Sequence, residues 1–194
     1  MKLFLQGPRQ IGKSTILRDA LLPHESHAAG LMVQRLFENG AMCGFRACVV
    51  DGTLPALTGA YEQDQRGIFL YNGHAFPHVL EDAVAEALTL CRSPRCTFII
   101  LDEIGGMELL STEFMQYLQE ILLLEKPCLG VIKSRDNLAH TASRLKLADK
   151  ILPLRDALQQ TLEADGKVLT VTEENRAETR QIVTAFINAY LIER

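Results

Sequence analysis

Short apolar runs alternate along the chain with longer segments in which apolar residues recur every three or four positions. The short runs are typical of buried strands, and the longer segments are typical of helices that bury one face. The predicted strands outside the hairpin described next are Lys2–Gln6, Gly67–Tyr71, Cys96–Leu101, Leu129–Ile132, Ile151–Leu154 and Val168–Val171. The predicted helices are Lys13–Leu22, Pro77–Cys91, Ser111–Leu124, Asn137–Leu147, Asp156–Ala164 and Glu174–Ile192. This alternation predicts an α/β fold with βαβ units around a mostly parallel sheet.

One pair of strands departs from the parallel pattern. The runs Gly30–Phe37 and Met42–Val50 flank the dipeptide Asn39-Gly40, which is the strongest short-range hairpin signal. We therefore expect an early antiparallel hairpin. Asp51–Arg66, which is rich in turn-forming residues, is expected to be a loop. No repeat or composition shift divides the chain, so residues 1–194 are expected to form one domain.

Composition excludes several classes of protein. The chain has 194 residues, 47% hydrophobic and 23% charged, which is ordinary for a globular domain. A net charge of −4 does not suggest a dedicated nucleic-acid binder, and no apolar stretch approaches the ~18 residues of a membrane span. The five cysteines lack C-x-x-C spacing, which favours free thiols over a zinc site. With no secretory signal, the expected location is the cytoplasm, and a monomer is favoured.

The first candidate site follows the first predicted strand and opens the first predicted helix. Its sequence fits G-x-x-x-x-G-K-[ST] in full, with Gly7, Pro8, Arg9, Gln10, Ile11, Gly12, Lys13 and Ser14, followed by Thr15. Glycines let such a loop bend around an anion, and backbone N–H groups together with the helix N-terminus attract phosphate. Lys13 is expected to reach the β- and γ-phosphates, and the Ser14 hydroxyl to bind Mg²⁺. Residues 7–15 are therefore predicted to bind a nucleotide.

The second candidate site is a pair of carboxylates after the run Phe98–Leu101. Asp102 is predicted to end a central strand, at the edge where open α/β sheets bind ligands, and to hold Mg²⁺. The adjacent Glu103 is expected to point elsewhere and to act as the general base toward water. A solvated loop carboxylate is the alternative for Glu103.

Through these motifs, the chain resembles the thermophilic-type, or cancer-related, nucleoside-triphosphatases. The family hallmark D-E-I-G-K-M-E-L corresponds to Asp102–Leu109, with seven of eight positions in agreement, and Ser111–Phe114 continues the likeness. The initial Gly-Pro of the phosphate loop, Gly44-Phe45 and Val171–Arg176 also resemble the family. The resemblance implies a RecA-like P-loop fold, a three-layer α/β sandwich, and Mg²⁺-dependent hydrolysis of nucleoside triphosphates with broad base tolerance.

Two positions depart from the family pattern. Gly106 stands where the hallmark has lysine, so this chain must do without that cation or take one from elsewhere. Arg9 and Gln10 replace a Pro/Gly-type segment of the loop, and Arg9 is expected to face solvent.

Weaker candidates have ordinary structural alternatives. His74 and His78 have helical metal-site spacing, but Pro77 predicts a helix start between them, so surface histidines are favoured. Arg135 and Arg144 flank a predicted helix and are candidates to stabilise phosphoryl-transfer charge, or are surface residues. Asn175 and Arg176 are candidates to approach the nucleobase, and the alternative is that they cap the last helix. Capping is favoured.

Three classes of function remain open from the sequence. The leading hypothesis is a nucleoside-triphosphatase in which Lys13 and Glu103 are catalytic and Mg²⁺ is bound by Ser14 and Asp102. The alternative is a nucleotide or small-molecule kinase, with the loop Asp51–Arg66 as a closing segment. A nucleotide-sensing switch is the third class, although the chain lacks the N-K-x-D motif of GTP switches.

Overall fold

A computed structural model describes residues 1–191. The strands are β1 (Lys2–Gln6), β2 (Ala28–Glu38), β3 (Ala41–Asp51), β4 (Thr58–Ala60), β5 (Ile68–Tyr71), β6 (His74–Ala75), β7 (Phe98–Ile104), β8 (Cys128–Ile132) and β9 (Gly166–Thr170). The α-helices are α1 (Lys13–Leu21), α2 (Pro77–Arg92), α3 (Thr112–Leu122), α4 (Arg135–Arg144), α5 (Ala148–Ala164) and α6 (Arg176–Leu191). Two 3₁₀ helices, η1 (Leu22–His27) and η2 (Met107–Leu110), complete the described chain.

The strands form one nine-stranded sheet within residues 1–191. Its order is β6-β5-β3-β2-β7-β8-β1-β9, with β4 paired to β2. The pairs β2-β7, β7-β8, β8-β1 and β1-β9 are parallel. The pairs β2-β3, β3-β5 and β5-β6 are antiparallel. One strand, β8, separates β1 from β7. The carboxyl ends of β1 and β7, which carry the two predicted motifs, therefore lie at the same edge of the sheet.

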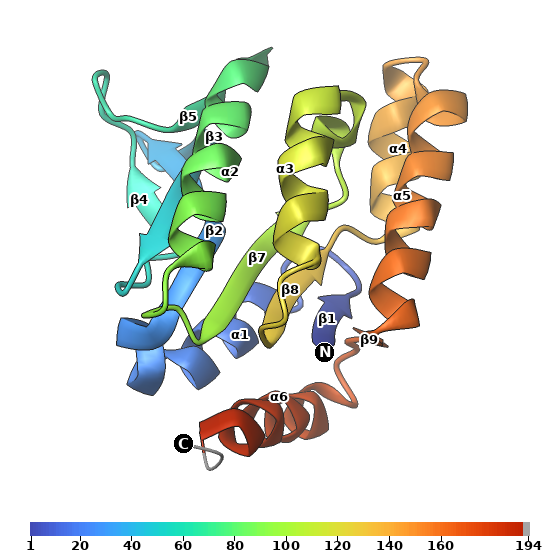
Figure 1. Cartoon of the computed structure of the whole chain (residues 1–194). Coiled ribbons are helices and arrows are strands. Elements are labelled where there is room, and N and C mark those ends of the chain that lie inside the picture. The colour runs from blue at the N-terminus through green and yellow to red at the C-terminus, as the bar shows by residue number, and fades with distance from the viewer. Residues whose placement is uncertain (192–194) are drawn as a thin grey trace.

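Helices cover both faces of the sheet, so the fold has three layers (Figure 1). One face packs against α1 and α6, and the other packs against α2, α3, α4 and α5. Successive residues of β7 alternate between these layers: Phe98 and Ile100 belong to the α1–α6 core, and Ile99 and Leu101 to the other. Burial on both faces explains the continuous apolar run in the sequence. The predicted α/β sandwich with its antiparallel hairpin is confirmed.

One predicted strand is wrong. Ile151–Leu154 lies inside α5, and Pro153 is accommodated within that helix. The buried positions of α5 are Ile151, Arg155, Leu158 and Leu162, which have helical spacing. Because the second of these positions is an arginine, the apolar pattern reveals the predicted helix Asp156–Ala164 and not the part of α5 before it.

The other differences are small. The predicted loop 51–66 contains the three-residue strand β4, and β6 has only two residues. Such short edge strands carry too few residues to show a period of two. The predicted last helix ends at Ile192, which lies outside the described residues.

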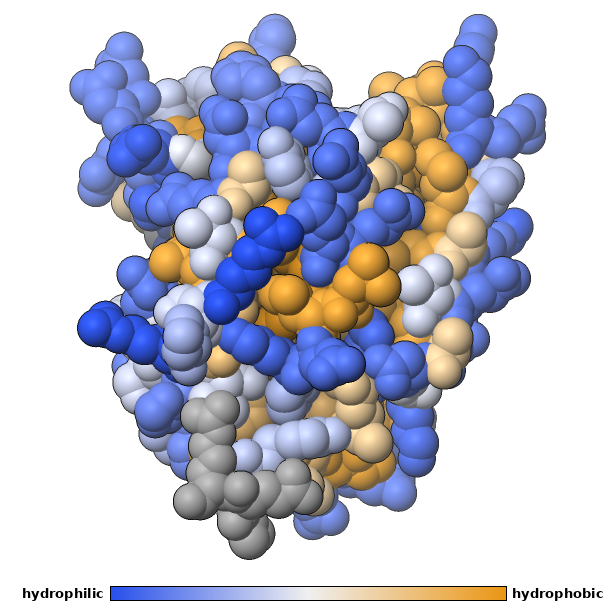
Figure 2. Space-filling view, in the orientation of Figure 1, coloured by the Kyte–Doolittle hydropathy of each residue, from blue (hydrophilic) through white to orange (hydrophobic). Residues whose placement is uncertain are grey.

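The surface of the α2–α5 face is mostly hydrophilic, with apolar residues reaching the surface near its middle (Figure 2). No helix in the part of the chain described by the structure has the length and apolar character of a membrane span. All five cysteines are free, and four of them are buried.

Candidate active site

The loop between β1 and α1 has an unusual backbone. Gly7 has φ of 140°, Gln10 of 62° and Gly12 of 94°, all in the region that L residues rarely adopt. A side chain at position 7 would also collide with the chain, because its Cβ would lie 2.5 Å from the carbonyl oxygen of Val171. Left-handed residues directly before a helix N-terminus are typical of concave anion sites. The loop therefore has the conformation that its sequence predicts.

The remaining predicted loop residues surround this turn. Pro8, Arg9 and Gln10 are exposed at its tip, while residues 11–15 are half-buried at the start of α1. Arg9 reaches back to α4, where its Nη2 donates to Thr141 Oγ1 at 3.4 Å.

Lys13 lies across the mouth of this loop. Its Nζ donates to the carbonyl oxygens of Gly7 at 3.0 Å and Pro8 at 2.6 Å. Burial lowers the pKa of the Lys13 ammonium, and the negative charges of Glu103 and Asp102 oppose this shift. The structure thus brings Lys13 and both predicted carboxylates into one electrostatic site.

Asp102 meets the first turn of α1. The alternation along β7 turns its side chain toward the α1 side, where Asp102 Oδ1 accepts a hydrogen bond from Ser14 Oγ at 2.9 Å. The residue is only 1% exposed, and its second oxygen, Oδ2, has no hydrogen-bond partner. Burial, aided by the charge of Glu103, raises the pKa of Asp102 to about 7.

This environment fits a divalent cation. Oxygen ligands from a hydroxyl and a carboxylate suit Mg²⁺, which usually binds few protein groups and retains several waters. A buried carboxylate oxygen without a partner is costly unless a cation or donor satisfies it. The predicted metal residues Ser14 and Asp102 are thus adjacent and chemically suitable. No cluster of three or more His, Cys, Asp or Glu suited to a metal occurs within residues 1–191.

Glu103 stands at an irregularity in β7. The pairing of β7 with β8 shifts register between Leu101 and Ile104, and Glu103 itself has φ of 60°. Bulges of this kind redirect side chains and occur often beside active sites. Glu103 is half-buried and makes no hydrogen bond or ion pair within residues 1–191. Its carboxylate is therefore not engaged in a structural contact.

A cation lies beside Gly106, in the turn after Glu103. Glu108 Oε1 accepts from the Gly106 N–H at 2.6 Å. A Cβ at position 106 would lie 2.7 Å from Glu108 Oε2 and 3.4 Å from Lys133 Nζ. The Lys133 ammonium, from the end of β8, thus lies next to the position where the resembled family carries lysine. No pattern of neighbouring residues predicts this long-range proximity.

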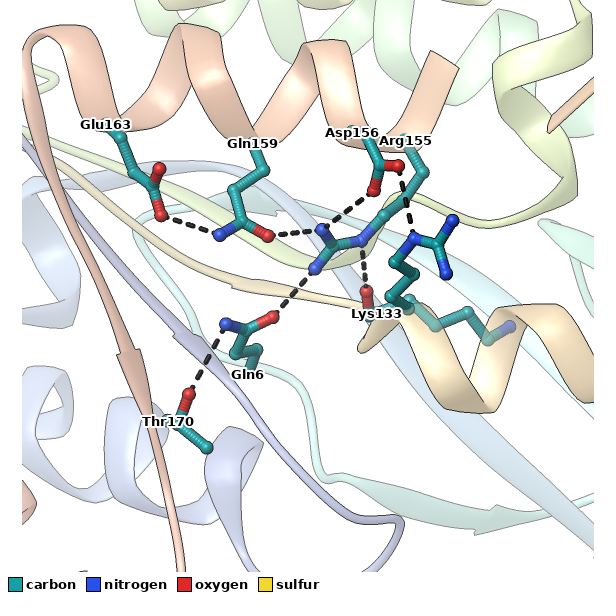
Figure 3. A network of polar contacts seen from close by, with 8 residues as sticks. Gln6, Lys133, Arg155, Asp156, Gln159, Glu163 and Thr170 are labelled. Carbon is teal, nitrogen blue, oxygen red and sulfur yellow. Dashed lines mark hydrogen bonds and ion pairs between the residues drawn. The ribbon is translucent and has the colours of Figure 1, made fainter. Parts of the chain in front are cut away.

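A buried arginine braces the start of the loop, and sequence reasoning missed it (Figure 3). Arg155 on α5 is 2% exposed. Its Nε donates to the Lys133 carbonyl at 2.9 Å, and its Nη2 donates to Gln6 Oε1 at 2.7 Å. Its Nη1 donates to Gln159. Gln6 is the last residue of β1, and Lys133 directly follows β8. Arg155 therefore connects two strand ends at the site.

The weaker candidates take ordinary positions. Arg135 pairs with Asp156 at 3.1 Å, and Arg144 ends α4 on the surface. His74 lies in β6 and His78 in α2, so they do not share a helix.

Asn175 closes the connection from β9 to α6. Its Oδ1 accepts from the Thr172 N–H at 2.8 Å, and its Nδ2 donates to the Thr170 carbonyl at 2.8 Å. These contacts support a structural role for Asn175 at the helix start.

A cavity of about 340 Å³ adjoins the start of the loop. Its lining comes from the ends of β1 and β9 and the beginning of α4: Gln6, Gly7, Pro8, Ser134, Arg135, Asp136, Asn137 and Thr170. Asn137 Nδ2 donates to the Gly7 carbonyl at 3.3 Å, which connects α4 to the loop.

Known proteins resemble the chain over nearly its whole length. The nucleoside-triphosphatase THEP1 of Pyrococcus abyssi is 28% identical over 185 residues, covering 92% of this chain and 87% of that protein. The cancer-related nucleoside-triphosphatase homolog of Mus musculus is 25% identical over 197 residues, covering 96% of each.

Solved structures show the same fold. The solution structure of a human cancer-related nucleoside triphosphatase aligns with a TM-score of 0.62 at 23% identity, covering 100% of this chain and 98% of that one. The crystal structure of THEP1 from Aquifex aeolicus aligns with a TM-score of 0.57 at 21% identity, covering 95% and 98%. A protein-family model described as NTPase matches residues 2–184. The chain belongs to this NTPase family.

Proposed function

We propose that the chain is a Mg²⁺-dependent hydrolase that removes the terminal phosphate of nucleoside triphosphates. The observation that carries the proposal is the hydrogen bond from Ser14 to the buried Asp102 at the phosphate loop, with one Asp102 oxygen unpartnered. Membership of the NTPase family supports the same activity. The names of the relatives do not favour the kinase alternative.

In this proposal residues 7–15 bind the phosphate tail. Backbone N–H groups of the loop and the start of α1 hold its charge, and Lys13 contributes its ammonium group at the same place. The contacts of Lys13 to Gly7 and Pro8 support this role, because they keep the ammonium over the loop.

Ser14 and Asp102 are the residues that would hold Mg²⁺. When bound, the ion supplies positive charge that neutralises the charge developing on the phosphate oxygens. Asp102 keeps its carboxylate close to Ser14, and its burial near the end of β7 limits the access of water to it.

Glu103 is proposed as the general base. Its half-buried carboxylate makes no hydrogen bond or ion pair within residues 1–191, so it is available to orient a water and accept its proton. Glutamate in this role contributes ~10²–10⁴-fold to the rate.

The decisive experiment measures phosphate release from a panel of nucleoside triphosphates, with and without Mg²⁺. Hydrolysis without an added acceptor is expected, and it must require Mg²⁺. Phosphate transfer only when an acceptor is added would instead establish a kinase. Tight binding without turnover would establish a switch.

Two variants test the assigned roles. Lys13→Ala is expected to weaken nucleotide binding and abolish turnover, whereas the exposed Lys150→Ala should leave both unchanged. Glu103→Gln should retain nucleotide affinity and lose most hydrolysis, and the exposed Glu113→Gln is its matched control. Unchanged phosphate release by Glu103→Gln would remove Glu103 from the mechanism.

The wider setting is also part of the proposal. We infer one catalytic domain over residues 1–194 that works as a monomer in the cytoplasm. Five free cysteines support a reducing compartment. Size-exclusion chromatography with light scattering tests the oligomeric state.

A further inference from the structure

The guanidinium group of Arg176 lies directly against the phosphate loop. A Cβ built on Gly12 would be 2.8 Å from Arg176 Nη2 and 3.0 Å from its Cζ. Gly12 is the N-cap of α1 and precedes Lys13, so a residue from the last helix reaches the anion-binding turn. Glycine at position 12 leaves room for this guanidinium.

No partner among residues 1–191 explains the position of the Arg176 side chain. Within residues 1–191 its side chain makes no hydrogen bond and no ion pair, although Glu173, Glu174 and Glu178 are close in sequence. Arg180, one turn later on the same helix, pairs with Asp19 on α1 at 3.4 Å. Two arginines of α6 therefore approach α1, and only Arg180 is engaged.

The backbone that carries Arg176 is well fixed. Asn175 holds the turn after β9 through hydrogen bonds to Thr172 and Thr170. The Thr179 N–H also donates to the Asn175 carbonyl at 2.8 Å, which secures the first turn of α6. The exposed guanidinium thus projects from a rigid base, as a ligand-contacting group should.

We propose that Arg176 contacts the phosphate tail of the bound nucleotide beside the start of α1. This inference rests on the proposed function of the loop. A guanidinium presents several N–H donors in one plane and matches phosphate oxygens in a bidentate manner. Its place beside Gly12 gives the phosphates a second cation in addition to Lys13.

The test compares Arg176→Ala, Arg176→Lys and the matched control Arg180→Ala in the full chain. Two probes are used: a non-hydrolysable ATP analogue with Mg²⁺, and inorganic tripolyphosphate as its competitor. Arg176→Ala is expected to weaken both by about tenfold or more, because charge-assisted hydrogen bonds to phosphate are lost. Arg176→Lys should fall between Arg176→Ala and wild type, and Arg180→Ala should bind both probes normally.

Each other outcome contradicts the proposal in a distinct way. If Arg176→Ala bound the ATP analogue more weakly but bound tripolyphosphate with unchanged affinity, the guanidinium would contact the nucleoside instead. Unchanged binding of both probes by Arg176→Ala would remove Arg176 from the site while leaving the proposed function intact. Failure of the wild-type protein to bind either probe would overturn the proposed function and this inference together. Thermal melting and the variant Arg176→Gln separate a folding defect from a binding defect.

Discussion

Two buried charged side chains flank the phosphate loop, and they differ in how many of their polar atoms have hydrogen-bond partners. On the α5 side, the Arg155 guanidinium is 2% exposed and donates to Gln6, Lys133 and Gln159. On the α1 side, the Asp102 carboxylate is 1% exposed, and one of its oxygens has no partner. Both charges are removed from water. Each nitrogen of the arginine has an acceptor, whereas one oxygen of the aspartate has no donor.

The difference separates a structural charge from a functional one. A buried charge with all its hydrogen bonds made can hold strand ends in place, because its desolvation is compensated. A buried carboxylate with a free oxygen raises the free energy of the folded chain until a cation satisfies it. The comparison therefore assigns support of the loop to Arg155 and ligand binding to Asp102.

Removal of the compensated charge should have the largest effect. Arg155→Ala leaves acceptors on Gln6 and Lys133 without their donor, and we expect a loss of about 3 kcal/mol or more in the free energy of unfolding. Urea denaturation measures this loss. Arg135→Ala is the control, because its ion pair with Asp156 is exposed and should contribute less than about 1 kcal/mol. Equal effects of the two variants would contradict the structural role of Arg155.

Neutralisation of the uncompensated charge should reduce activity. Asp102→Asn keeps the size of the side chain and removes a charged oxygen ligand, so Mg²⁺-dependent turnover should fall about a hundredfold or more. Steady-state phosphate release as a function of Mg²⁺ concentration tests this. Wild-type turnover at saturating Mg²⁺ would show that Asp102 does not serve the metal.

The same variant should be more stable than the wild type when Mg²⁺ is chelated. The amide has no charge to desolvate, so we expect a gain of about 1–3 kcal/mol at pH 8. The pKa of Asp102 is raised to about 7 in the folded chain, above its ordinary value of 3.8. The folded carboxyl therefore keeps its proton where the unfolded one has lost it, and stability falls as pH rises from about 4 to about 7.

A pair of melting curves checks this sign. The advantage of Asp102→Asn over wild type should be present at pH 8 and should shrink toward pH 5. An advantage that grows as pH falls would show that the carboxylate form is the favoured one in the fold.

The smallest effect is expected at Gly106. Any side chain there must displace the Glu108 carboxylate from the Gly106 N–H, so Gly106→Ala and Gly106→Lys should each lose about 1 kcal/mol of stability. Since Lys133 already provides a cation at this position, the lysine variant should be no more active than the alanine variant. A several-fold higher kcat for Gly106→Lys would show that Lys133 does not substitute for it.

Local sequence was sufficient to predict the two motifs, but not the residues from distant segments that hold them in place. The apolar run before Asp102 and the glycine spacing of residues 7–14 predicted the strand edge and the loop, because both are encoded by neighbouring residues. The family resemblance was likewise confirmed over residues 2–184. The roles assigned to Lys13, Ser14, Asp102 and Glu103 stay predictions, although the structure brings these residues together.

The failures share a physical cause. Arg155 occupies a buried helical position, which hid the first part of α5, before the predicted helix Asp156–Ala164, and the network that Arg155 forms. The hydrogen bond of Arg155 with Gln6 and the proximity of Lys133 to Gly106 and of Arg176 to Gly12 join segments far apart in the chain. No periodicity of residues within one segment can reveal such contacts.

The left-handed backbone of Glu103 has a practical consequence for protein engineering. A non-glycine residue in this conformation costs about 1 kcal/mol or more, and glycine or asparagine would relieve that cost. A search for heat-resistant variants would therefore select Glu103→Gly or Glu103→Asn, and under the proposed mechanism each selected protein would be robust and inactive. A screen that ranks variants of this enzyme by thermal tolerance alone would therefore favour substitutions of Glu103 that abolish hydrolysis.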